Sequence, residues 1–138
     1  CRRLRIRLNN AVVHDWFELT LVQNVLIDGL LYPLVYDKMD QWLGEQGAED
    51  VSMLTEFMRD WYKDSLRWTN AMVKAVAGES DANREQLQAW INQWEPQIYQ
   101  ALTPLAEATS GLEALDETRA QLAARLSKFG LNSQGVSA

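Results

Sequence analysis

The sequence predicts an all-α protein, an antiparallel bundle of long, kinked helices, and three observations lead to that class. Apolar residues make up 47% of the 138 residues, which is enough for a hydrophobic core. Only 3 prolines and 7 glycines interrupt the chain, and its apolar residues recur at helical spacing. No segment alternates apolar and polar residues over strand length with turn signals on both sides. We therefore expect residues 1–138 to form a single helical domain.

The first predicted helix runs from about residue 11 to about residue 43. Its apolar side chains are nearly continuous, which is typical of a helix surrounded by others. Pro33 predicts a kink near Gly29, because proline cannot donate a hydrogen bond to that carbonyl. At about 100° per residue, its polar side chains gather on one side of the helix. This stripe, with the glycine and two tyrosines that join it, comprises His14, Glu18, Asn24, Asp28, Gly29, Tyr32 and Tyr36.

The second predicted helix runs from about residue 51 to residue 76, with Gly78 ending it. Spacings of four and three residues alternate along it, as in the packing seam of a coiled coil. We therefore expect this seam to face another helix; it comprises Leu54, Met58, Trp61, Ser65, Trp68, Met72 and Ala75.

A third helix is predicted to start at Ser80 or Asp81, and a fourth to span about residues 112–129. Pro96 falls inside the apolar pattern of the third, which predicts a kink or a break near Trp94, and Pro104 is a second such position. Residues 131–138 are mostly small or polar and are predicted to form a frayed tail.

Charge and cysteine content exclude several classes of protein. The net charge is −6, and four of the 13 basic residues stand within the first seven positions, so the remaining chain is strongly acidic. This argues against nucleic acid and against an anionic membrane surface as partners. The polar residues of the first helix also argue against a signal peptide or a membrane span. The single cysteine, Cys1, allows no disulfide within the chain and suits the cytoplasm.

A helical core raises the question of a metal centre. A di-iron site in such a bundle needs two Glu-x-x-His pairs and two further glutamates. The sequence has 1 histidine, His14, and no acidic residue stands three positions before it. We therefore expect no di-iron site in this chain. His14 and Glu18 share a helix face and could in principle bind a metal, but two ligands do not complete a site, and we favour a hydrogen-bonded pair.

Asp28 leaves two interpretations open. A carboxylate in an apolar helix is costly unless it is paired or solvated. It could contact another subunit or support a neighbouring site, or it could lie on a solvated face. The adjacent Gly29 would allow close approach of another helix. The 6 tryptophans are interpreted as core or interface residues rather than as the lining of a ligand pocket.

Specific strings in the sequence resemble a known family. These are His14-Asp15-Trp16-Phe17-Glu18 and Asp28-Gly29-Leu30-Leu31-Tyr32-Pro33, with weaker similarity continuing from about residue 12 to residue 126. They resemble the β subunit, the smaller ferritin-like subunit, of the oxygenase component of bacterial phenol hydroxylases. This component belongs with the toluene and methane monooxygenase hydroxylases, and a β segment does not separate these branches.

The resemblance implies a ferritin-like fold and a non-catalytic structural role. In that family the α subunit holds the di-iron site, β supports it, and γ completes the hydroxylase. An NADH-dependent reductase and an effector protein complete the system, which converts phenols to catechols. The family's β subunit is more than twice as long, so this chain is expected to be its C-terminal part. The alternative is a stand-alone helical interaction or regulatory module, which would expose no large apolar patch.

One hypothesis about Asp64 and Arg67 follows from the resemblance. In a ferritin-like relative, the helix paired with the first would supply Glu-x-x-His, and this chain offers Asp64-Ser65-Leu66-Arg67 instead. The arginine would then replace the charge of the metal. The hypothesis fails if both side chains face water away from the stripe between His14 and Asp28.

Overall fold

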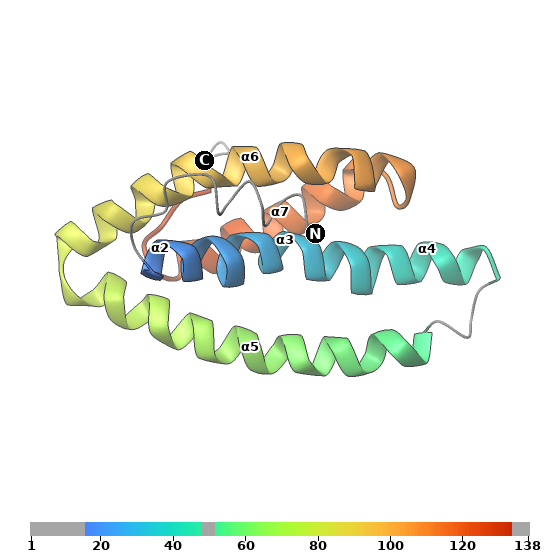
Figure 1. The fold of residues 1–138 in the computed structure, drawn as a ribbon, viewed down its shortest axis with the longest axis horizontal. Helices are drawn as coiled ribbons and strands as arrows, with labels where there is room; N and C mark the ends of the chain where they lie inside the picture. Colours follow the sequence, from blue (N-terminus) through green and yellow to red (C-terminus); the bar gives the residue numbers. More distant parts are fainter. Residues whose placement is uncertain (1–15, 48–51, 134–138) are drawn as a thin grey trace.

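The computed structural model describes residues 16–47 and 52–133, and all regular structure in these ranges is helical, as predicted. A continuous helix over Trp16–Glu45 occupies the middle of the bundle. The helices α5 (Ser52–Glu79) and α6 (Asp81–Ala108) flank it on opposite sides, and α7 (Leu112–Ser127) packs behind it against α6 (Figure 1). Short connections join successive helices, which therefore run antiparallel.

The long central helix is the core of the protein. The central helix is long and apolar enough to cross a membrane. The buried core helix of a soluble protein meets the same criterion of length and hydropathy. Here α5, α6 and α7 all contact it. Burial of the leucine and valine side chains of the central helix supplies much of the hydrophobic stabilisation of the fold. Six side chains of this helix have no solvent exposure: Leu21, Val22, Val25, Leu26, Leu30 and Leu34.

The central helix changes its hydrogen-bonding pattern along its length. It runs as α2 (Trp16–Thr20), π-helical η1 (Leu21–Ile27), α3 (Asp28–Tyr32), π-helical η2 (Pro33–Met39) and α4 (Asp40–Glu45). Pro33 begins the second π-helical stretch. Because proline has no N–H to donate, the wider turn that begins there accommodates its ring without ending the helix.

The predicted seam of α5 is wrong. The helix buries Thr55, Thr69, Val73 and Ala77, whereas the predicted seam residues Trp61 and Trp68 are 51% and 57% exposed. Two apolar stripes run along α5, and periodicity does not distinguish them. The stripe of smaller residues meets the central helix, because small side chains allow helices to approach closely. Gly78 lies inside the helix, which ends at Glu79 rather than before the glycine.

Of the kink or break predicted for the third helix near Trp94, the break is wrong. The helix α6 begins at Asp81, with the Ser80 hydroxyl accepting a hydrogen bond from the Asn83 amide at 3.1 Å, and it continues through Pro96 and Pro104. Each proline removes a backbone hydrogen bond. Buried side chains on both sides of Pro96, including Ile91, Trp94 and Ile98, offset that loss.

The chain after α7 packs further than predicted. Leu131 has no solvent exposure, and the backbone of Asn132 exchanges two hydrogen bonds of 2.8 Å with the side chain of Gln88. The Ser133 hydroxyl donates to the buried Glu95 carboxylate. The prediction of a frayed tail is therefore wrong for residues 131–133, because Leu131 fills the core beside α6. Residues 134–138 lie outside the described ranges.

Candidate functional site

Asp28 lies on the buried side of the central helix, at the start of α3. Burial raises the pKa of its carboxyl to about 6, although a hydrogen bond from Gln23 and the charge of Arg125 act in the opposite direction. The Gln23 amide donates to Oδ1 over 3.4 Å. The interpretation of Asp28 as a residue on a solvated face is therefore wrong.

Gly29 is the point of closest approach between the central helix and α7. A Cβ atom on Gly29 would stand 3.0 Å from Leu122 Cδ1 and 3.6 Å from Arg125 Nη1. The close helix approach predicted for this glycine is present. It also places the guanidinium of Arg125 next to the backbone beside Asp28.

Arg125 is a half-buried cation that the sequence did not point to. Its Nη2 donates to Thr69 Oγ1 at 3.1 Å, its Nε donates to Asn70 Oδ1, and its buried Nη1 has no hydrogen-bond partner among the described residues. Burial lowers the pKa of this guanidinium, and the charge of Asp28 partly compensates. In the sequence, Arg125 is an ordinary arginine of a predicted helix, and no local signal separates it from an exposed one.

Aromatic rings connect the central helix to α5 near Asp28 and Arg125. Tyr32 stacks on Tyr62 with ring centroids 4.8 Å apart and planes inclined by 8°. The Tyr32 ring also lies 5.1 Å from Tyr36 and 5.8 Å from Trp61. Burial, and then the negative charge of Asp28, raise the pKa of Tyr32 from 10 to about 12.

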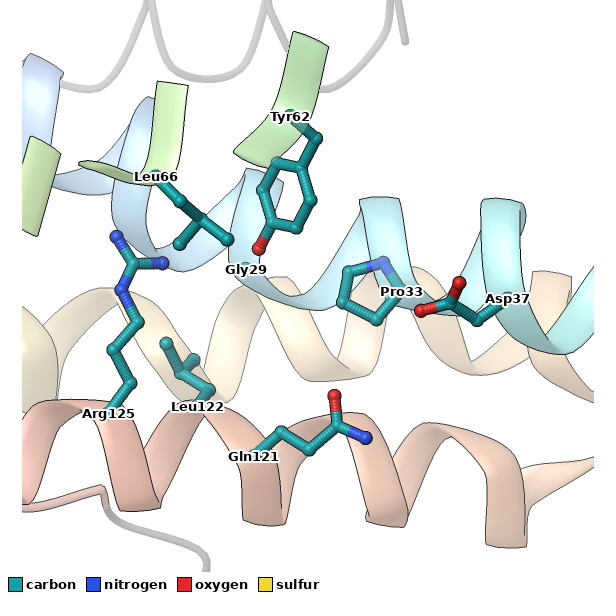
Figure 2. Close-up of a pocket in the computed structure, with 8 residues that line it drawn as sticks. All are labelled: Gly29, Pro33, Asp37, Tyr62, Leu66, Gln121, Leu122 and Arg125. Atoms are coloured by element: carbon teal, nitrogen blue, oxygen red, sulfur yellow. The ribbon is translucent and has the colours of Figure 1, made fainter. Parts of the chain in front are cut away.

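A cavity of about 200 Å³ opens between the central helix, α5 and α7. Figure 2 shows the Tyr62 hydroxyl directed into it toward Gly29 and the Gln121 amide directed into it from α7. The guanidinium of Arg125 stands at the opposite side from the Asp37 carboxylate. The complete lining is Gly29, Pro33, Asp37, Tyr62, Leu66, Gln121, Leu122 and Arg125.

The other candidate residues do not join this site. Glu18 is buried, and its Oε1 accepts a hydrogen bond of 2.7 Å from the Trp94 indole. His14, its predicted partner, lies outside the described residues. Asn24 is half-buried on the turn before Asp28.

The hypothesis on Asp64 and Arg67 is wrong for this bundle. Their side chains are 78% and 83% exposed, and they pair with each other at 3.5 Å. The cation that lies near Asp28 is supplied by α7 instead, from Arg125.

The residues around Asp28 do not fit a metal centre. Among residues 16–47 and 52–133, no three His, Cys, Asp or Glu side chains gather closely enough to hold a metal ion. The groups next to Asp28 are an amide and a guanidinium. A guanidinium has no lone pair to offer a metal and repels a cation.

One face of α5 carries large rings that the bundle leaves uncovered. Phe57, Trp61 and Trp68 are 73%, 51% and 57% exposed. Their spacing of four and seven residues places them on one side of the helix. We refer to these three residues as the aromatic face. Single exposed apolar residues are common, but a row of them is typical of an interaction surface.

Comparison with known proteins identifies the relatives of this chain. The family model described as Methane/Phenol/Alkene Hydroxylase matches residues 3–80. The chain is 60% identical over 126 residues to the phenol 2-monooxygenase oxygenase component DmpL of Pseudomonas sp. strain CF600, and covers 38% of it. It is 41% identical over 117 residues to the oxygenase component MhpL of Acinetobacter pittii strain PHEA-2, and covers 35% of it.

A solved structure is also closely similar. A chain of xenon-pressurised phenol hydroxylase from Pseudomonas sp. OX1 superposes with a TM-score of 0.90 and 71% sequence identity. The match covers 96% of this chain and 40% of that chain. The present chain therefore spans about two-fifths of the length of its relatives, and the ferritin-like helical architecture agrees with the expectation from the sequence.

Proposed function

Because this chain belongs to the methane/phenol/alkene hydroxylase family, we propose that it is a non-catalytic part of the β subunit of a multicomponent phenol hydroxylase. In this role it supports an α subunit that holds a di-iron site and converts phenols to catechols. The assembly would include a γ subunit, an NADH-dependent reductase and an effector protein, all in the cytoplasm. Both named relatives are oxygenase components of phenol 2-monooxygenases.

The aromatic face is the observation that carries this proposal. It lies within the stretch that matches the family, on a helix whose opposite face is already packed against the core. Exposing three large rings to water is unfavourable by about 25 cal/mol for each Å² of apolar surface. Another part of the oxygenase would cover these rings, because aromatic residues are enriched at the buried centres of protein interfaces. The rival function, a stand-alone module, is disfavoured by the same face.

The non-catalytic part of the proposal rests on the interior of the bundle. The buried carboxylate of Asp28 faces Arg125, so the charge that a metal would supply comes from a side chain. Metal analysis of the purified chain tests this part. Iron bound in stoichiometric amount by this polypeptide alone would overturn it.

The scaffolding role can be tested in the assembled hydroxylase. The double variant Phe57→Gln/Trp68→Gln removes two rings of the aromatic face without touching the core. We expect at least a tenfold loss of assembled hydroxylase on size-exclusion chromatography, with helix content unchanged. The matched control Lys63→Gln/Arg67→Gln alters two exposed positions on the same helix and should assemble normally. Equal assembly of both variants would contradict the proposal.

A further inference from the structure

The cavity between the central helix, α5 and α7 has dimensions that restrict its ligand. Its volume is about 200 Å³. An aliphatic cavity of about 150 Å³ is known to hold benzene, whereas drug-sized ligands occupy pockets of about 300–1,000 Å³. The space therefore suits one six-membered ring with a small substituent.

The walls suit an aromatic ring. Pro33, Leu66 and Leu122 supply apolar surface on three sides, and the ring of Tyr62 lines another (Figure 2). Gly29 adds no side chain to the lining, and Leu122 and Arg125 pack close to its backbone. A flat ring can lie beside Leu122, close to the central helix.

The polar groups of the lining favour a neutral ligand. Asp37 pairs with Arg59 at 3.2 Å, and the charge of Arg125 faces that of Asp28. Asp37 is thus paired and Arg125 lies near the opposite charge of Asp28, so a charged ligand would lose its hydration for little net gain in charge pairing. The Nη1 of Arg125, which has no hydrogen-bond partner among the described residues, can donate to a neutral hydroxyl oxygen. The Tyr62 hydroxyl and the Gln121 amide remain, directed into the cavity. Each can donate and accept a hydrogen bond, as can a ligand hydroxyl.

We propose that this cavity is a binding site for a neutral single-ring phenol, separate from any metal centre. The ring lies between Pro33, Leu66 and Leu122 over Gly29. Its hydroxyl exchanges hydrogen bonds with Tyr62 and Gln121. The ligand class follows from the size and lining of the cavity and does not require that the chain assemble with a di-iron subunit.

The position of the ligand is tested by diffraction. Crystals of the protein soaked with 4-bromophenol should show an anomalous bromine peak between Tyr62 and Leu122. Bromine peaks at other places only, with none in this cavity, would overturn the proposal. Because the peak locates the ligand on this chain, the result stands even if the proposed role in a hydroxylase fails.

Binding in solution is tested with phenol and benzene by calorimetry. Gln121→Trp places a large ring at the exposed mouth of the cavity and should weaken the binding of both probes at least tenfold. Gln100→Trp, at an exposed position of α6 outside the lining, is the matched control and should bind as the unmodified protein does. Equal phenol affinity in the two variants would overturn the proposal.

The hydroxyl contact has its own test. Tyr62→Phe keeps the ring stacked on Tyr32 but removes the hydrogen-bonding group. Loss of one hydrogen bond should weaken phenol binding about fivefold and leave benzene binding unchanged. An unchanged phenol affinity, or an equal loss for both probes, would contradict the assignment of the Tyr62 hydroxyl.

Discussion

Leu122 Cδ1 of α7 lies 3.0 Å from the position that a Cβ would occupy on Gly29. The central helix and α7 therefore touch at a point where an added Cβ would make an unusually tight contact. This contact also places Arg125, one turn further along α7, beside the same glycine. The position of Arg125 near Asp28 and the cavity both depend on this close approach.

Gly29→Ala should destabilise the protein. The added methyl group forces Leu122 or α7 to shift, and overpacking of this kind costs about 1–3 kcal/mol. Gly78→Ala is the matched control, because nothing lies within 4 Å of its Cβ position in α5. That change should stabilise the helix by about 0.5–1 kcal/mol. Urea unfolding measures both, and a stabilised Gly29→Ala protein would refute the close contact.

Asp28 should make stability depend on pH between about 4 and 6. The pKa of Asp28 is about 6 in the folded protein and 3.8 for a free aspartate. Between these values the folded state binds the proton more tightly than the unfolded state, so the free energy of unfolding falls as pH rises. Asp28→Asn removes this dependence. Its stability relative to the unmodified protein should rise by up to about 3 kcal/mol from pH 4 to pH 7 and then remain level.

Chemical unfolding at several pH values tests this expectation. Asp64→Asn alters an exposed carboxylate and serves as the control, with changes below about 0.5 kcal/mol. A stability difference between Asp28→Asn and the unmodified protein that does not vary with pH would show that Asp28 is not desolvated in the fold.

Trp94→Phe should cost about 1–3 kcal/mol of stability, because it removes the indole N–H that the buried Glu18 carboxylate accepts. Trp68→Phe changes a tryptophan of the aromatic face and should be nearly neutral in the chain alone. Thermal or urea unfolding compares the two. Equal effects of the two substitutions would indicate that the hydrogen bond between α2 and α6 contributes no stability.

Leu131→Ala should destabilise the protein by about 2–5 kcal/mol, as expected for a fully buried leucine. Asn132→Ala, which removes an exposed side chain but keeps the bonded backbone, should change stability by less than about 0.5 kcal/mol. If Leu131→Ala has as little effect as Asn132→Ala, the segment after α7 does not pack as the structure has it.

Part of the candidate site could be predicted from local sequence. Asp28 and Gly29 stand out because a carboxylate and a glycine interrupt an otherwise apolar helix, and both take part in the contact with α7. Arg125 could not be found in this way, since arginine is common on exposed helix faces. Its role depends on a contact between helices far apart in the sequence. The choice of Arg67 as the compensating cation was wrong for the same reason.

The periodicity of apolar residues determined by itself that this protein is a helical bundle around the segment Trp16–Glu45, because hydrogen bonding and side-chain spacing within a helix are local. Only the tertiary structure decided which stripe of α5 is buried, where the chain after α7 packs, and which cation meets Asp28. These outcomes depend on how closely side-chain shapes allow neighbouring helices to approach, and a single helix does not contain that information.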